Sequence, residues 1–114
     1  MDIQQTAPDT DLDIEAIVME LLVNAGSARS AALMAIGQAR KSNFEQAQLM
    51  LNQAKQAINE AHTIQTRLIG LDEGEGKLKV SLIVVHAQDH LMNAMLIQDL
   101  AQDFIELYRR TQNL

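Results

Sequence analysis

Two stretches of this chain repeat small and apolar residues at alternating spacings of four and three, which is the period of a packed α-helix. The first stretch runs between residues 14 and 39: Ile14, Val18, Leu21, Ala25, Ala28, Ala32, Ala35 and Ala39. The second runs between residues 44 and 68: Phe44, Ala47, Leu51, Ala54, Ile58, Ala61, Gln65 and Leu68. Alanine supplies five of the eight residues of the first face and three of the eight of the second, so a neighbouring helix backbone can approach each of them closely.

Residues that break a helix are rare and confined to a few places. The single proline is Pro8, and the five glycines lie at 26, at 37 and between 70 and 76. A Ser-x-x-Glu capping box beginning at Ser42 predicts the start of the second helix, and Gly70 predicts its end. An all-β sandwich, which needs many turns with Gly, Pro or Asn, is therefore excluded.

The third segment, from about residue 77 to residue 110, contains nothing that breaks a helix, and its apolar residues point to every side. At 100° per residue, Leu91, Met95 and Ile97 fall in different directions around the axis. A helix that is apolar all round must be buried all round. Two companion helices cover only part of it, so we expect other subunits to cover the remaining face.

The length of 114 residues fits one domain. We predict an all-α, antiparallel, up-down-up three-helix bundle over residues 13–114. Residues 1–12 are polar and acidic and contain Pro8, so we expect them to form a flexible leader.

Charge and composition restrict the class of function. With 9 basic and 15 acidic residues the net charge is −6, and no basic stripe indicates a nucleic-acid partner. The absence of cysteine excludes disulfides and thiolate sites. No uninterrupted apolar run approaches the roughly 20 residues of a membrane span, and the N-terminus lacks the features of a signal peptide. These features predict a soluble cytoplasmic protein with no membrane insertion.

A polar cluster interrupts the apolar third segment: His86, Gln88, Asp89 and His90. The two histidines are four residues apart and therefore share a helix face, whereas Asp89 lies about 60° around the helix from His86. Polar groups in a buried helix are costly unless they are hydrogen-bonded or used in chemistry.

Spacing alone permits three interpretations of this cluster. It can be a hydrogen-bonded layer that sets register and oligomeric state, or a metal site, since His-x-x-x-His is a common two-ligand pattern. It can also be a nucleophilic site, because neutral imidazole accepts and releases a phosphoryl group. The metal interpretation lacks an obvious third ligand on the same face.

Residues 77–92, KLKVSLIVVHAQDHLM, resemble the signature of the lactose/cellobiose class of enzyme IIA in the bacterial phosphoenolpyruvate-dependent sugar phosphotransferase system. Residues 24–30 (NAGSARS), 59–62 (NEAH) and 74–77 (GEGK) resemble further segments of that family, so the resemblance covers nearly the whole chain. Within the family, the sequence is most similar to the N,N′-diacetylchitobiose branch.

The resemblance implies a homotrimer, in which three subunits form a nine-helix bundle. His86 matches the histidine that accepts phosphate on Nε2 from the histidine-containing phosphocarrier protein and passes it to a cysteine of enzyme IIB. His90 matches the second, supporting histidine. Asp89 matches an aspartate near the three-fold axis, where some members hold a divalent cation such as Mg²⁺. No cofactor is implied for the phosphoryl transfer itself.

The resulting functional hypothesis is a cytoplasmic phosphocarrier for uptake of a β-linked disaccharide of the diacetylchitobiose, cellobiose or lactose class. Its rivals are a structural helical oligomer and a metal-binding bundle with a buried His/Asp layer. The sugar itself is not predicted, because a membrane subunit recognises it. Among other residues, Arg29 is expected to form a surface salt bridge, with contact to a partner or phosphate as the alternative. Gly26 is expected to permit close helix contact, with open space beside a neighbouring His86 as the alternative, and His62 to be a surface or packing residue.

Overall fold

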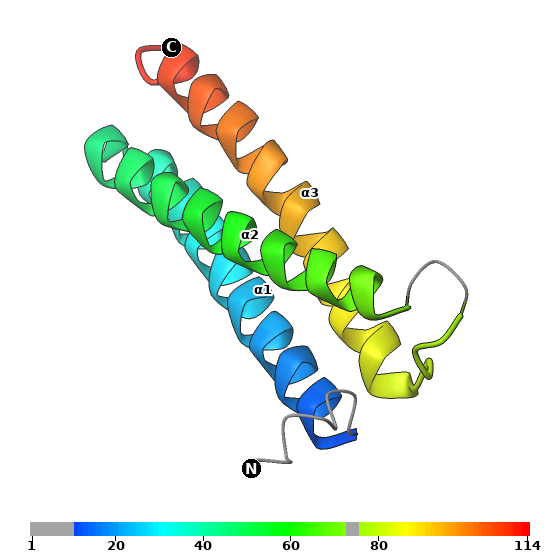
Figure 1. Cartoon of the computed structure of the whole chain (residues 1–114). Coiled ribbons are helices and arrows are strands. Elements are labelled where there is room, and N and C mark those ends of the chain that lie inside the picture. Colours follow the sequence, from blue (N-terminus) through cyan, green and yellow to red (C-terminus); the bar gives the residue numbers. More distant parts are fainter. Residues whose placement is uncertain (1–10, 73–75) are drawn as a thin grey trace.

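The computed structural model describes residues 11–72 and 76–114. Within them the chain forms three helices and no strand: α1 (Asp11–Arg40), α2 (Phe44–Asp72) and α3 (Leu82–Thr111). The helices run up, down and up, so α1 and α3 point in the same direction (Figure 1). The predicted all-α, three-helix fold is confirmed.

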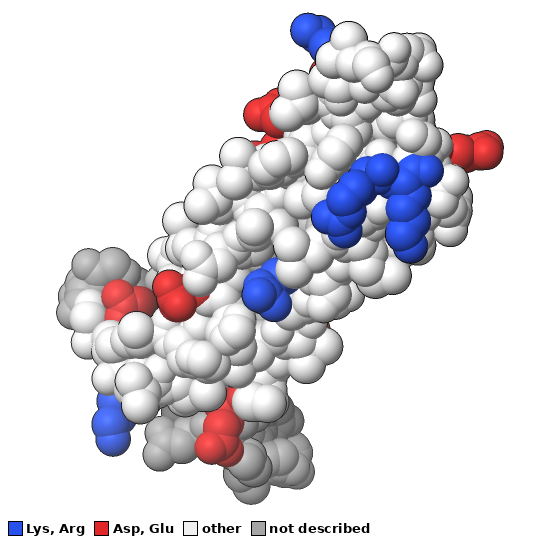
Figure 2. All heavy atoms as spheres, turned by 180° about the vertical axis from the view of Figure 1, so that it is seen from behind, with Lys and Arg blue, Asp and Glu red and all other residues white. Residues whose placement is uncertain are grey.

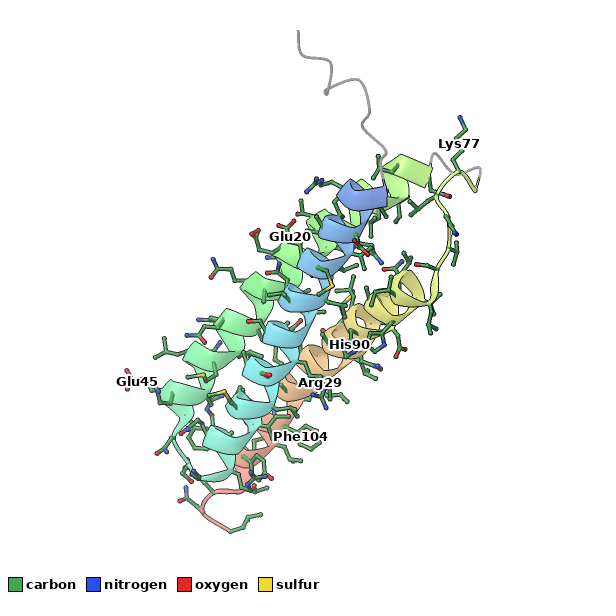
Figure 3. The ribbon with its side chains drawn as sticks, turned by 90° about the horizontal axis from the view of Figure 1, so that it is seen from below. Glu20, Arg29, Glu45, Lys77, His90 and Phe104 are labelled. Carbon is green, nitrogen blue, oxygen red and sulfur yellow. The ribbon has the colours of Figure 1, made fainter. Side chains whose placement is uncertain are left out.

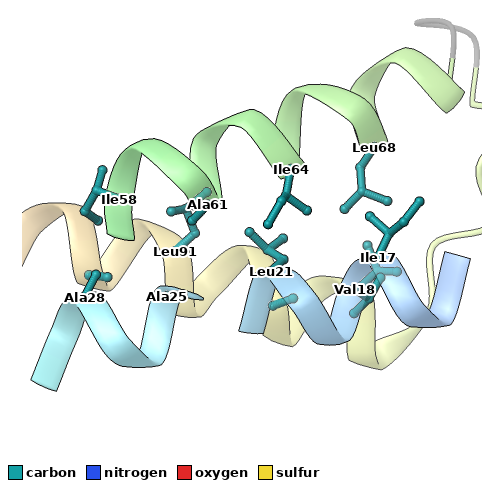
Figure 4. Packing of buried hydrophobic residues seen from close by; sticks show 13 residues of the cluster. Ile17, Val18, Leu21, Ala25, Ala28, Ile58, Ala61, Ile64, Leu68 and Leu91 are labelled. Carbon is teal, nitrogen blue, oxygen red and sulfur yellow. The ribbon is translucent and has the colours of Figure 1, made fainter. Parts of the chain in front are cut away.

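The alternating repeats form the core of the bundle. From Val18 to Ala39, each member of the first repeat is at most 1% exposed, and most of the second repeat is buried as well. Leu21 of α1 and Leu91 of α3 point into the space between the three helices (Figure 4). Full burial of one such leucine contributes about 2 kcal/mol to the free energy of unfolding.

Helix α1 is the central element of the subunit. It packs extensively against both α2 and α3, whereas α2 and α3 contact each other much less. The alanines of α1, such as Ala25 and Ala28, lie in the core and let its neighbours approach closely. The position of α3, which carries the polar cluster, therefore depends mainly on α1.

Helix α3 is apolar on its outer side as well as in the core, as its sequence predicts. Its inner face buries Val84, Leu91 and Ile105. Large apolar side chains are exposed on the remaining faces of the same helix: Leu82, Ile83, Val85, Met92, Leu96, Leu100, Phe104 and Leu107. The single subunit thus leaves an extensive apolar surface uncovered.

Helix α1 also has an apolar outer surface. Between Ile14 and Arg40 it is long and apolar enough, by length and composition alone, to cross a membrane. No uninterrupted apolar run in the sequence marks this helix. The reason is that apolar residues lie on two faces, a buried seam and an exposed set that includes Met19 and Val23. The rear view of the molecule shows a mostly uncharged surface on which Lys, Arg, Asp and Glu side chains are scattered (Figure 2). The buried seam identifies α1 as a core helix.

The turn between α1 and α2 differs from the predicted capping box. Ser42 has a left-handed φ of 64°, its N–H donates to the carbonyl of Ala39, and the N–H of Asn43 donates to that of Gln38. This pair of bonds is a Schellman motif, so Ser42 ends α1 instead of capping α2. Asn43 precedes the first residue of α2, and its carbonyl accepts the N–H of Ala47.

The connection between α2 and α3 is longer than predicted: although α2 continues past Gly70 to Asp72, α3 begins only at Leu82 instead of at about residue 77. The Asp72 carboxylate accepts the backbone N–H groups of Gly76 and Leu78, at 3.2 and 2.8 Å, and so holds the connection against α2. Ser81 caps α3, since its side chain accepts the N–H of Val84.

The predicted boundary of the N-terminal leader lies within a helix. Helix α1 begins at Asp11, inside the segment 1–12 that the sequence assigned to the leader. Residues 1–10 lie outside the described residues.

Candidate functional site

His86 and His90 form a contacting pair on the surface of α3. Their Nε2 atoms lie 3.0 Å apart, which is hydrogen-bonding distance, and the ring centroids are 4.3 Å apart in an edge-on arrangement with an 80° angle between the ring planes. His86 is exposed and His90 is half-buried. The prediction that a spacing of four puts both imidazoles on one face is confirmed.

The hydrogen bond between the two rings constrains their protons. One Nε2 must carry the proton that is donated, and the other must offer a lone pair. The ring that accepts has its single Nε2 lone pair directed at the N–H of the other ring, so the two rings must separate before that nitrogen can attack. A nucleophilic nitrogen next to a donor is an arrangement that suits attack on an electrophile whose oxygens become negative.

The other polar residues of the cluster point in different directions from the histidine pair. Gln88 is half-buried toward α2, where its Oε1 accepts Nε2–H of Gln65 at 2.9 Å. Asp89 is exposed on the outer side of α3, and Asn93 donates to its Oδ2 at 3.4 Å. Over the described ranges no polar or charged residue is buried within the single subunit.

Asp89 is the residue to test for a metal ion. It lies among exposed apolar side chains of α3, with Val85 on the preceding turn and Met92 on the next. Residues 11–72 and 76–114 contain no group of three His, Asp or Glu side chains that could hold a metal. A single chain therefore offers Asp89 as one isolated carboxylate, and a cation there needs carboxylates from further copies.

Of three further residues on α1 and α2, two depart from the expectations from sequence and one agrees with them. Arg29 is exposed and forms no ion pair or hydrogen bond within the described part of the chain, contrary to the expected salt bridge. A Cβ built on Gly26 meets no atom within 4 Å, so this glycine is not required for close helix contact within the subunit. His62 lies exposed on α2, in agreement with a surface histidine.

Comparison with known proteins identifies the family of the chain. Residues 16–109 match the family described as the lactose/cellobiose-specific IIA subunit of the phosphotransferase system. The N,N′-diacetylchitobiose-specific EIIA component of Escherichia coli strain K12 is 49% identical over 106 residues, which cover 90% of this chain and 91% of the relative.

Two solved structures are similar to the subunit. The crystal structure of the cellobiose-specific enzyme IIA of Bacillus anthracis is 39% identical, with a TM-score of 0.83 over 95% of this chain and 97% of the other. Escherichia coli IIA(chitobiose), solved in complex with HPr, is 49% identical, with a TM-score of 0.75 over 86% of this chain and 95% of the other.

The three-helix subunit with an exposed histidine pair is thus that of a phosphotransferase component that carries phosphate in the cytoplasm. The chain belongs to the lactose/cellobiose-specific IIA subunits of the sugar phosphotransferase system. Membership of this family decides against the structural oligomer and the metal-binding bundle as the main function.

Proposed function

We propose that His86 is the phosphoryl acceptor of this IIA subunit and that His90 supports it. The main support for this proposal is the 3.0 Å contact between the Nε2 atoms of the two residues. His86 is the more exposed of the two, so a protein donor reaches it more easily. In this assignment His86 Nε2 holds the lone pair and His90 Nε2–H donates to it.

The transfer follows from that assignment. The two rings first separate, which frees the lone pair of His86 Nε2. That lone pair forms a bond to phosphorus, while the nitrogen–phosphorus bond of the donor phosphohistidine breaks and its electron pair returns to the donor ring. His86 Nε2 then no longer accepts a hydrogen bond, and His90 Nε2–H turns to a phosphoryl oxygen. Such a step needs mainly positioning and charge stabilisation, and no cofactor.

The partners follow from the family. The donor is the histidine-containing phosphocarrier protein, supported by the relative that was solved in complex with HPr. The acceptor is a cysteine thiolate of enzyme IIB, which takes the phosphoryl group while His86 recovers its lone pair. The transported sugar is a β-linked disaccharide of the diacetylchitobiose, cellobiose or lactose class, supported by the names of the relatives.

The assembly is a homotrimer in which the α3 helices meet around the axis and form a nine-helix bundle with α1 and α2. The exposed apolar side chains of α3, including Val85, Met92 and Leu96, support a subunit interface on this helix. Asp89 belongs to the same exposed side, so three copies bring three carboxylates together. A divalent cation such as Mg²⁺ fits these oxygen ligands and would neutralise their mutual repulsion.

Incubation with phosphoenolpyruvate, enzyme I and the phosphocarrier protein tests the assignment of His86. The wild-type chain should acquire one acid-labile, alkali-stable phosphate per subunit. His86→Ala should acquire none while keeping its helical content and molecular mass. Phosphate on the His86→Ala protein would show that another histidine is the acceptor, and an unphosphorylated wild-type chain would contradict the proposed function.

A further inference from the structure

The histidine pair lies on the side of α3 that borders α1. The two helices run in parallel, and their first turns line one open hollow of about 240 Å³, to which Val18 contributes from α1 and Ile83 and Val84 from α3. Val18 and Val84 line the same hollow and therefore lie at about the same height along the bundle. His90 is six residues beyond Val84, so it lies at about the height of residue 24 of α1. On α3, Ile83 and His90 are seven residues apart and thus occupy the same side of the helix.

Arg29 lies on the matching side of α1. It is seven residues beyond Leu22, which packs at the edge of the core, and three beyond Gly26, above which no atom lies within 4 Å. The view from below shows Arg29 and His90 on the same face of the α1–α3 pair (Figure 3). Arg29 is about 7 Å of helix rise past the level of His90. Helical side chains lean toward the N-terminus, so its guanidinium leans back toward the histidines.

Within the described residues the guanidinium of Arg29 is not paired with a carboxylate, whereas those of several other arginines are. Arg67 lies 4.0 Å from Glu20, and Arg109 and Arg110 both bind Glu106. Arg29 is exposed and has no ion-pair or hydrogen-bond partner anywhere in residues 11–72 and 76–114. An exposed guanidinium without an internal partner is a ready contact for an external anion.

The surroundings make such a contact useful. The chain carries a net charge of −6, and Asp89 lies one residue before His90, so the protein as a whole repels a phosphoryl group that bears negative charge. A local positive charge beside the target nitrogen offsets this repulsion and orients the incoming anion.

We propose that Arg29 is a positioning residue that attracts the negatively charged phosphoryl group of the donor protein and so guides the donor onto the α1–α3 face over His86 and His90. The inference rests on the proposed function and names a further residue of the same site. Arg29 affects how fast the donor protein binds and how it is oriented when bound. It takes no part in bond formation, because it lies past the histidine pair along the bundle.

The test compares Arg29→Gln with Arg67→Gln, which removes the same charge from an exposed arginine of α2. Phosphoryl transfer from the purified phosphorylated phosphocarrier protein is measured over a range of donor concentrations at low and high salt. Arg29→Gln should lower kcat/KM about three- to tenfold at low salt through a higher KM, with kcat unchanged. The difference should shrink in high salt, because screening removes exposed electrostatic effects. Arg67→Gln should behave as the wild type, and Arg29→Lys should recover most of kcat/KM.

Four outcomes would overturn the proposal. Equal kcat/KM for Arg29→Gln and Arg67→Gln at low salt would show that the position of the charge is irrelevant. A salt-independent loss of kcat would place Arg29 on the transferred group itself, and a changed molecular mass by light scattering would make it a subunit contact. An unphosphorylated wild-type chain would contradict the proposed function itself. In the three other outcomes the wild-type chain is phosphorylated, so the two kinds of failure are distinguishable.

Discussion

Replacing His90 tests how the histidine pair works, because the variant removes the partner of His86 and keeps His86 itself. In the free protein His90→Ala deletes the 3.0 Å contact between the two Nε2 atoms. In the phosphorylated protein it deletes the N–H that donates to a phosphoryl oxygen. His90 is only half-buried and lies within a helix, where alanine is favourable, so the fold should be unaffected.

The expected size of the effect follows from that single hydrogen bond. A hydrogen bond to a charged group contributes about 1.5–3 kcal/mol, and each 1.36 kcal/mol corresponds to a factor of ten in rate. Because the pair lies at the protein surface, where water competes, the lower part of the range applies. We therefore expect His90→Ala to accept phosphate about tenfold more slowly than the wild type while still reaching one phosphate per subunit.

Rapid-quench measurement of transfer from the phosphorylated phosphocarrier protein gives this rate directly. His62→Ala is the matched control, since it removes an exposed histidine from α2, away from the pair. Wild-type rates for His90→Ala would refute the supporting role of His90. Complete loss of acceptance in a folded His90→Ala protein would refute the assignment of His86 as the nucleophile.

Three further predictions concern assembly, backbone conformation and pH. Asp89→Leu should preserve or strengthen the oligomer, because apolar packing is often as good as a buried charge cluster, and should leave His86 an acceptor. Light scattering and the transfer assay check both parts, and dissociation into monomers would contradict the first. Gly26→Ala should raise the free energy of unfolding by about 1 kcal/mol, since its Cβ site is open, whereas Gly76→Ala should lower it because φ there is +71°. Denaturant unfolding gives both signs, and a destabilised Gly26→Ala would reveal that another subunit packs on residue 26. A hydrogen bond from Arg110, together with the charge of that residue, lowers the pKa of Glu106, so this ion pair stabilises the end of α3 above the ordinary carboxyl pKa and is lost as pH falls through the lowered value. An NMR titration in which Glu106 has an unshifted pKa would be evidence against the pair.

The periodic repeats were sufficient to predict the helices and their buried faces. Residues such as Leu21 and Ala54 could be assigned to the core because the spacing of three and four depends on helix geometry alone. Helix ends were predicted less well. Ser42 satisfies a capping-box pattern but serves as the end of α1, and Gly70 is accommodated within α2, where Leu68 and Leu71 on either side pack against the core. Short patterns of this kind compete with the burial of neighbouring residues, which the local sequence does not reveal.

The site was predictable where it depends on one helix. The contact between His86 and His90 follows from their spacing, but the hydrogen bond from Gln65 to Gln88 joins two helices and depends on their packing. The missing salt bridge of Arg29 has the same origin, because the presence of a carboxylate beside it is decided by the arrangement of α1 and α3. The neighbours of Asp89 in an assembly come from other subunits, so the packing of one chain does not determine them.

The unequal packing of the helices has a consequence for the order in which the subunit forms. Contacts between α1 and α2 close a short loop, whereas α3 docks on α1 across a separation of more than 60 residues. Because closing a longer loop costs more chain entropy, we expect the α1–α2 hairpin to form first. Helix α3, with both histidines, follows α1 and α2 along the chain, so it is synthesised after them and docks on a hairpin in which the alanines of α1 already pack against α2. The chemistry of the protein therefore arises at the final stage of its folding, together with the apolar surface through which subunits associate.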